Sequence, residues 1–108
     1  MINNVTLVGR LTKEPELKEA NNASVCSFTI AVDRNYKNSA GERETDFIPI
    51  TAWRKLAEIC AKNLSKGRMV GITGRIQTRS WDTEDGKRAW AMEVVAENVV
   101  FLDKKKDD

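Results

Sequence analysis

Histidine is absent from this 108-residue sequence, and cysteine and proline occur only twice each. Without histidine, most zinc sites, the serine–histidine and cysteine–histidine nucleophile pairs and the commonest general base are excluded. The sequence also lacks a Walker loop, a GxSxG motif and a GxGxxG motif. The carboxylate pairs Asp82/Asp85 and Glu42/Glu44 lie in turn sequence, where solvated loop residues are the ordinary interpretation. We therefore expect no catalytic residue, no metal site and no cofactor.

Long apolar runs are also missing, and none approaches the roughly 20 residues of a membrane-spanning helix. The first four residues have neither the basic nor the apolar region of a secretory signal. The two cysteines, Cys26 and Cys60, lie far apart among apolar residues and form no CxxC pair. Their number allows a disulfide, but buried thiols in a reducing compartment are favoured. These observations predict a cytoplasmic protein.

Excess charge of one sign is lacking too, since 18 Lys and Arg residues face 16 Asp and Glu residues, a net charge of +2. The distribution of the charges is more informative than their sum. Residues 66–81 contain Lys66, Arg68, Arg75 and Arg79 and no acid, whereas acids gather in residues 14–19, 42–46 and 82–85. A segregated basic stretch of this kind is typical of a local nucleic-acid-binding surface.

Period-two alternation of apolar residues dominates the chain and indicates β-strands. It appears in five runs, at residues 5–11, 25–32, 47–53, 69–81 and 89–102. Pro49 suggests a strand edge or a bulge, because proline cannot donate to a β-ladder, and the fifth run changes register near Asn98, as at a bulge. Between the third and fourth runs, Leu56, Ile59, Cys60 and Leu64 follow helical spacing, and Gly67 suits a helix stop.

Three strands, one short helix and two strands is the order of the OB-fold. We therefore predict an all-β fold, a five-stranded Greek-key barrel with one short helix between strands 3 and 4. An antiparallel sandwich with one added helix is the alternative architecture. The predicted domain covers residues 1–103, and residues 104–108 form a short charged tail.

Parity within the strands separates core residues from surface residues. Phe47 and Trp53 lie on the face opposite Ile48, Ile50 and Ala52. Arg75, Arg79 and Trp81 similarly lie opposite Val70, Ile72 and Ile76. A flat aromatic surface for each base and a nearby cation for each phosphate is what single-strand binding requires.

The other aromatic residues divide between the surface and the core. Tyr36 lies in the predicted hairpin segment 34–46, beside Arg34 and Lys37. Phe28 and Phe101 have apolar neighbours at core spacing. Trp90 shares parity with Met92 and Val94, which favours the core or a subunit interface.

Several segments closely resemble bacterial single-stranded DNA-binding proteins. They are residues 4–16 (NVTLVGRLTKEPE), 27–32 (SFTIAV), 53–58 (WRKLAE), 66–67 (KG), 74–81 (GRIQTRSW) and 93–96 (EVVA). The resemblance runs in order over residues 1 to 103 with few gaps. It implies an OB barrel, assembled as a homotetramer, that binds DNA in replication, recombination and repair.

The resemblance also implies site residues. The stacking aromatics of the family match Tyr36, Phe47, Trp53 and Trp81. Its phosphate-contacting basic residues are best matched by Lys55, Lys66 and Arg79, with Arg10, Arg34 and Arg75 as further matches. Family members generally continue into a flexible linker and an acidic tip that recruits replication and repair proteins. This sequence ends at Asp108, so we do not expect that recruitment from it.

We thus predict a non-enzymatic, nucleoid-associated protein whose partners are single-stranded DNA and further copies of itself. An OB domain for RNA or carbohydrate is an alternative, although a sugar site needs no row of Lys and Arg. The choice of DNA over RNA depends on the resemblance alone. A small carboxylate-based nuclease is the alternative from another class.

Overall fold

Six strands and one helix make up the computed structural model, which describes residues 1–103. The elements are β1 (Val5–Leu11), β2 (Glu16–Ala20), β3 (Ala23–Lys37), β4 (Arg43–Trp53), α1 (Arg54–Asn63), β5 (Met69–Asp82) and β6 (Arg88–Phe101). The predicted charged tail, residues 104–108, lies outside the described residues.

The strands close into a barrel through the ring β1–β5–β6–β4–β3–β1. Closure is uneven. β3 and β4 pair over most of their length, whereas the parallel β4–β6 contact consists of Ile50 with Val94 and Thr51 with Val95. Pro49 therefore lies where β4 has β3 as its one neighbour, as its missing N–H predicts. The all-β barrel with a single helix before its last two strands is confirmed.

β2 was not predicted. It is a sixth strand outside the ring, whose five strands are the five that the sequence predicts. The first four residues of β2 are exposed, because β2 lies at the edge of the sheet and pairs only with β3. Asn21 and Asn22 connect the two strands with φ values of 54° and 62°. Two consecutive left-handed residues form the tight turn that suits a two-residue hairpin.

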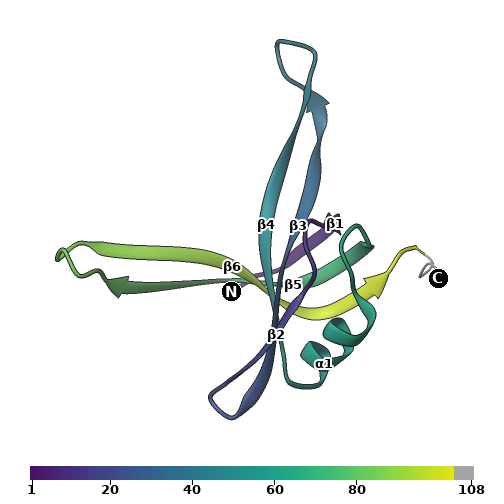
Figure 1. Ribbon diagram of the computed structural model, residues 1–108. Coiled ribbons are helices and arrows are strands. Elements are labelled where there is room, and N and C mark those ends of the chain that lie inside the picture. Colours follow the sequence, from purple (N-terminus) through teal and green to yellow (C-terminus); the bar gives the residue numbers. More distant parts are fainter. Residues whose placement is uncertain (104–108) are drawn as a thin grey trace.

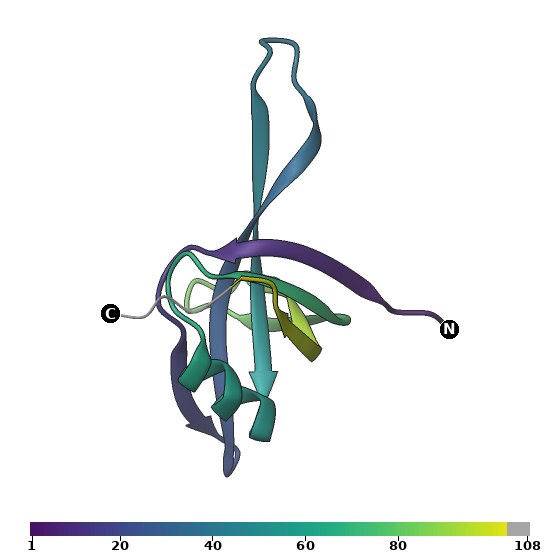
Figure 2. The same cartoon turned by 90° about the vertical axis from the view of Figure 1, so that its right-hand side faces the viewer.

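The core contains the alternating side chains that the sequence predicts. Cys26, Phe28 and Ile30 of β3 face Ile50 and Ala52 of β4 inside the barrel. The remaining core members are Leu11, Ala57, Cys60, Leu64, Val70, Ile72, Val94 and Ala96. α1 packs its Ala57 and Cys60 side against one end of the barrel (Figures 1 and 2). Both cysteines are buried free thiols, as expected.

Two glycines permit close approaches that barrel closure requires. A Cβ on Gly9 would lie 2.6 Å from the carbonyl oxygen of Ala31, where β1 crosses β3. A Cβ on Gly74 would lie 2.1 Å from the carbonyl oxygen of Val95. At this point the β5–β6 register shifts, because Thr73 pairs with Asn98 and Gly74 pairs with Ala96. The register change predicted near Asn98 is thus a β-bulge, which bends the strand.

Two long hairpins project from the barrel in different directions. Figure 1 shows the outer parts of β3 and β4 rising above the barrel and β5–β6 extending to its left. Figure 2 shows the first of these as a narrow arm standing clear of the other strands. Within residues 1–103, no second layer covers these hairpins beyond the barrel, so both of their faces are open to solvent.

This openness corrects several core predictions. Ile76 and Met92 are 40% and 49% exposed, because they lie on the projecting β5–β6 hairpin. Trp90 is 71% exposed on the same hairpin, so it does not belong to the core of the isolated chain. Phe101 is 37% exposed, and the Arg68 guanidinium lies 5.6 Å from its ring centroid. Phe101 ends β6, where its ring covers Arg68 instead of entering the core.

Candidate nucleic-acid interface

A groove with a volume of about 610 Å³, here called the main groove, lies on the outer face of β3 and β4. The β1–β2 loop borders it on one side and the β5–β6 hairpin on the other. Its lining residues are Thr12, Lys13, Glu14, Glu16, Ser27, Phe28, Thr29, Phe47, Pro49, Ile50, Thr51, Arg79 and Glu93. In OB-folds, this sheet face and the corresponding loops bind oligonucleotides and oligosaccharides.

Phe47 is the aromatic side chain of the main groove. It pairs with Ala31 and points away from the core, as its parity predicts, and it is 66% exposed. The same ring also lines a second groove of about 500 Å³, formed by Val8, Gly9, Arg10, Ala31, Asp33, Thr45, Phe47 and Met69. Phe47 therefore lies at the junction of two grooves, with an open ring on which a base can stack.

Arg79 and Trp81 form a cation–aromatic pair on the β5–β6 hairpin. The Arg79 guanidinium carbon lies 5.3 Å from the centroid of the Trp81 ring, which is 43% exposed. Arg79 lines the main groove together with Phe47, so it lies between this groove and Trp81 on the hairpin. Arg75 lies on the same face and donates to the Gln77 side chain over 2.9 Å. The predicted sharing of one face by these cations and Trp81 is confirmed.

Tyr36 and Trp53 lie outside the two grooves. Tyr36 is 63% exposed on the outer arm of β3, within the irregular stretch between Asp33 and Lys37 in the pairing with β4. Trp53 ends β4 and is only half-buried. Arg54 follows it with a φ of 58°, a left-handed conformation that turns the chain sharply into α1. A strand of nucleic acid contacting all four aromatics would have to pass over most of this molecule.

The predicted phosphate ligand Arg34 is held by two acids. Its Nε and Nη2 donate to the two Asp46 carboxylate oxygens over 3.1 and 3.0 Å, and its Nη1 donates to Glu44. The hydrogen bond from Arg34 holds the pKa of the Asp46 carboxyl below its usual range, and Asp46 raises the pKa of Arg34. Arg34 thus links β3 to β4 through these hydrogen bonds. The two carboxylates largely offset its positive charge.

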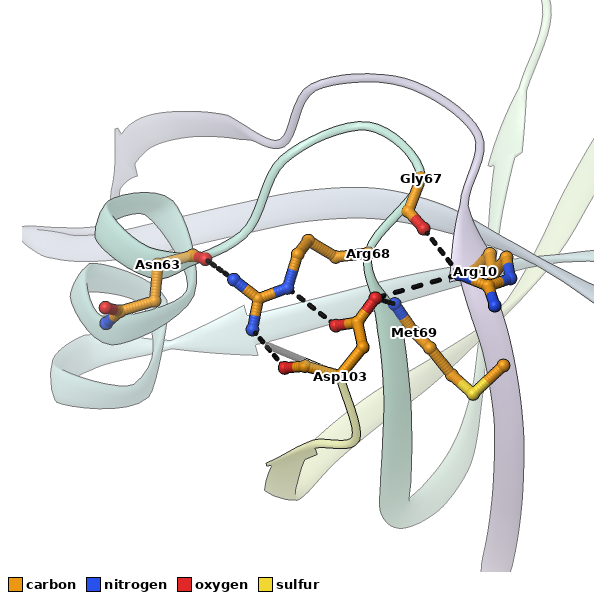
Figure 3. A network of polar contacts seen from close by, with 6 residues as sticks. All are labelled: Arg10, Asn63, Gly67, Arg68, Met69 and Asp103. Atoms are coloured by element: carbon orange, nitrogen blue, oxygen red, sulfur yellow. Dashed lines mark hydrogen bonds and ion pairs between the residues drawn. The ribbon is translucent and has the colours of Figure 1, made fainter. Parts of the chain in front are cut away.

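The basic stretch 66–81 is not one continuous surface. Arg68 is only 9% exposed and donates from Nε to Asp103 over 2.8 Å and from Nη1 to the Asn63 carbonyl over 3.2 Å (Figure 3). The other Asp103 oxygen accepts from the Met69 backbone N–H, and this bond lowers the pKa of the Asp103 carboxyl. Arg68 therefore supports the barrel, and its charge is not presented at the surface.

Arg10 belongs partly to the same network. Its Nη1 donates to the Gly67 carbonyl over 3.0 Å and lies 3.7 Å from Asp103, yet the side chain remains 55% exposed (Figure 3). Arg10 also lines the second groove. Lys55 and Lys66 are exposed at the start of α1 and in the turn before β5. Neither has an ion pair among residues 1–103.

Of the predicted site residues, the two grooves bring together Phe47, Arg10 and Arg79. Sequence reasoning missed Lys13, Thr51 and Glu93 in the main groove. The parity of β4 could have indicated Thr51, which follows Phe47 and Pro49 on the outer face. Lys13 is on a loop that has no periodic pattern, so only the fold places it.

Two further classes of site are not found in the described part of the chain. No group of three or more His, Cys, Asp or Glu side chains within residues 1–103 is arranged to hold a metal ion. No helix among these residues is long and apolar enough to cross a membrane.

Comparison with known proteins gives one consistent result. The model of the Single-strand binding protein family matches residues 2–102 of this chain. The chain is 58% identical over 106 residues to a single-stranded DNA-binding protein of Caldanaerobacter subterraneus subsp. tengcongensis, covering 97% of this chain and 71% of that protein. It is 53% identical to single-stranded DNA-binding protein 2 of Clostridium acetobutylicum, covering 98% and 80%. It is 51% identical to single-stranded DNA-binding protein 3 of Streptococcus agalactiae, covering 97% and 77%.

Proposed function

Because the chain belongs to the single-strand binding protein family, we propose that it binds single-stranded DNA along the two grooves that meet at Phe47. Binding has little sequence preference, since stacking is available to every base. Membership of this family makes the chain a DNA-binding protein and not an enzyme.

The exposed ring of Phe47 is the observation that supports this site best. A phenylalanine that is 66% exposed at the meeting point of two grooves leaves apolar surface in water. Stacking of a base removes that surface from water and contributes about 1–3 kcal/mol. Tyr36, Trp53 and Trp81 supply further stacking surfaces for a strand that continues beyond the grooves.

The phosphates are contacted by cations at the borders of this path. Lys55, Lys66, Arg75 and Arg79 have no ion pair among the residues described, so their charges are available to a polyanion. Arg10 contributes after giving up a long contact with Asp103. Arg34 contributes least, because leaving Asp46 breaks two hydrogen bonds.

We place this activity in replication, recombination and repair, where single strands are exposed and need protection. Since the matched relatives are bacterial, the expected place of action is the cytoplasm, at the nucleoid.

Assembly into a homotetramer is part of the proposal and is supported by two separate apolar surfaces. The hairpin patch comprises Ile76, Trp90 and Met92, on one face of β5–β6. The barrel patch comprises Val8 on β1, Val100 on β6 and Leu102 directly after β6, each 46–51% exposed. Exposed apolar clusters indicate contact surfaces, and a tetramer with dihedral symmetry uses more than one self-complementary interface.

Sedimentation equilibrium at micromolar concentration tests the assembly. A tetramer mass is expected, and replacement of Trp90 by Ser should shift the mass toward a dimer. A monomer mass at every concentration would refute this part of the proposal.

Binding is tested by anisotropy titration with oligo(dT) of graded lengths, against duplex DNA and oligo(U) at equal salt. Tight binding of oligo(dT) that strengthens with length until the site is filled is expected, with much weaker binding of duplex. Equal affinity for duplex and single strand would contradict the stacking mechanism, because paired bases are not free to stack on protein rings.

A further inference from the structure

Glu93 places a carboxylate in the main groove, among residues that otherwise suit a base. Its Oε2 atom accepts a hydrogen bond from the Thr51 hydroxyl over 2.6 Å. Thr51 is only 6% exposed, so water competes little for this bond and the carboxylate has a fixed position. Phe47, Pro49 and Thr51 form one row on the outer face of β4, and Glu93 lies at the Thr51 end of that row.

Glu93 lies beyond ion-pair distance of every cation in the described part of the chain. Its Oε1 atom accepts no hydrogen bond from residues 1–103. The lining of the main groove contains two cations, Lys13 and Arg79, against the three carboxylates Glu14, Glu16 and Glu93. A phosphate would be repelled from the floor of such a groove, so the backbone follows the basic borders and the bases turn inward.

A carboxylate at the floor also distinguishes one base from another. An ionised carboxylate only accepts hydrogen bonds. Cytosine and adenine present an exocyclic amino group, which donates, whereas thymine presents a carbonyl oxygen at the corresponding position, which accepts. The free Oε1 atom of Glu93 therefore attracts an amino-bearing base and repels the carbonyl of thymine.

We propose that Glu93, held by Thr51, is a specificity-determining residue that favours cytosine or adenine over thymine at one position of the bound strand. This inference depends on the proposed binding of single-stranded DNA in the main groove. Phe47 and Thr51 are four residues apart on one strand, about 13 Å. Glu93 would thus contact a different base from the one stacked on Phe47.

The test compares (dC) and (dT) oligonucleotides of equal length for the wild type and Glu93→Gln. Glutamine keeps the shape and an oxygen that accepts from Thr51, but its amide adds a donor for the thymine carbonyl. The ratio of the (dC) affinity to the (dT) affinity should fall about fivefold or more in the variant. Competition anisotropy at one salt concentration measures both affinities on the same protein sample.

Glu97→Gln is the matched control. Glu97 lies on the same strand, is exposed and lines neither groove, so the variant removes one negative charge without touching the main groove. Both affinities should rise together in this control, with an unchanged ratio. Thr51→Val provides a second variant, because it releases Glu93 without altering its charge, and it should reduce the ratio in the same direction.

Two results would overturn the inference. One is a ratio in Glu93→Gln within twofold of the wild type. This includes an equal rise of both affinities, as in the control, which would make Glu93 a source of general repulsion only. If the wild type bound neither oligonucleotide, the proposed function would fail and this inference with it, whereas binding with an unchanged ratio overturns this inference alone.

Discussion

Replacing Phe47 by alanine should separate DNA binding from folding, because the ring lies on the sheet face opposite the core. Full burial of a phenylalanine side chain contributes about 1.5–3 kcal/mol. With 66% of Phe47 exposed, only a third of that contribution is present, so the variant should lose roughly 0.5–1 kcal/mol of unfolding free energy. Loss of one stacking surface should weaken single-strand binding by about 1–3 kcal/mol, or roughly 5- to 150-fold in Kd.

The same substitution at Phe28 is the internal control. Phe28 is 6% exposed and pairs with Ile50 inside the barrel. Phe28→Ala should cost about 3–5 kcal/mol of stability through lost transfer energy and the remaining cavity. Phe28 also lines the main groove, but it is buried and offers little ring surface for stacking. The fraction that stays folded should therefore keep most of the wild-type affinity for DNA, because the exposed stacking rings are unchanged.

Urea unfolding followed by circular dichroism measures the stability of each variant, and anisotropy titration with oligo(dT) measures binding. The reasoning would be refuted if Phe47→Ala lost more than about 2 kcal/mol of stability while its folded fraction bound normally. Phe47 would then be a packing residue, and the parity of β4 would have been assigned to the wrong face.

The charged groups and the thiols provide three more expectations. The slope of log K against log[salt] should be near −3 to −4 per subunit, at about 0.7 per phosphate contact. Asp46→Asn should steepen this slope by up to about 0.7, because it leaves Glu44 as the one acid that holds Arg34. An unchanged slope would show that Arg34 gains no phosphate contact when Asp46 is neutralised. The pKa of Asp103 in the folded protein lies below its ordinary value of 3.8. Ionised Asp103 therefore stabilises the folded protein above pH 3.8, and this contribution is lost as the pH falls through the pKa of the folded state. The difference in urea midpoint between wild type and Asp103→Asn should thus shrink below about pH 4, and an equal difference at pH 7 and pH 3 would contradict this. Burial raises the pKa of Cys26 and raises that of Cys60 to about 12. Neither thiol should therefore react with a disulfide reagent at pH 8 until urea unfolds the protein. Labelling of the native protein would show that the core opens around the cysteines.

The parity of apolar residues predicted the barrel interior because alternation reports burial directly. Phe28, Ile30, Ile50 and Ile72 are all buried as expected. Parity cannot report where a sheet stops having a second layer. Ile76 continues the alternation of β5, yet it lies beyond the bulge at Gly74 on a hairpin that nothing covers.

β2 illustrates the opposite limit. An edge strand with polar residues on both faces has no alternation, and its pairing with β3 is visible only through the Asn21–Asn22 turn. The same limit applies to the site. Phe47 and Arg79 were predicted from their strands, whereas Lys13 and Glu93 join them in the main groove only through the fold.

The net charge of +2 raises the question of how this chain binds a polyanion, and the ion pairs give the answer. Arg34 donates hydrogen bonds to Asp46, and Arg68 donates one to Asp103. The charges of these two arginines therefore stabilise the protein itself. In the proposed mode of binding, the carboxylates of the main groove keep phosphates at its borders. Electrostatic attraction is thereby reduced to a few border cations, and base stacking must supply a correspondingly large share of the binding energy. Discrimination between single and double strands follows from this balance, because a duplex offers the same phosphates but keeps its bases stacked on one another.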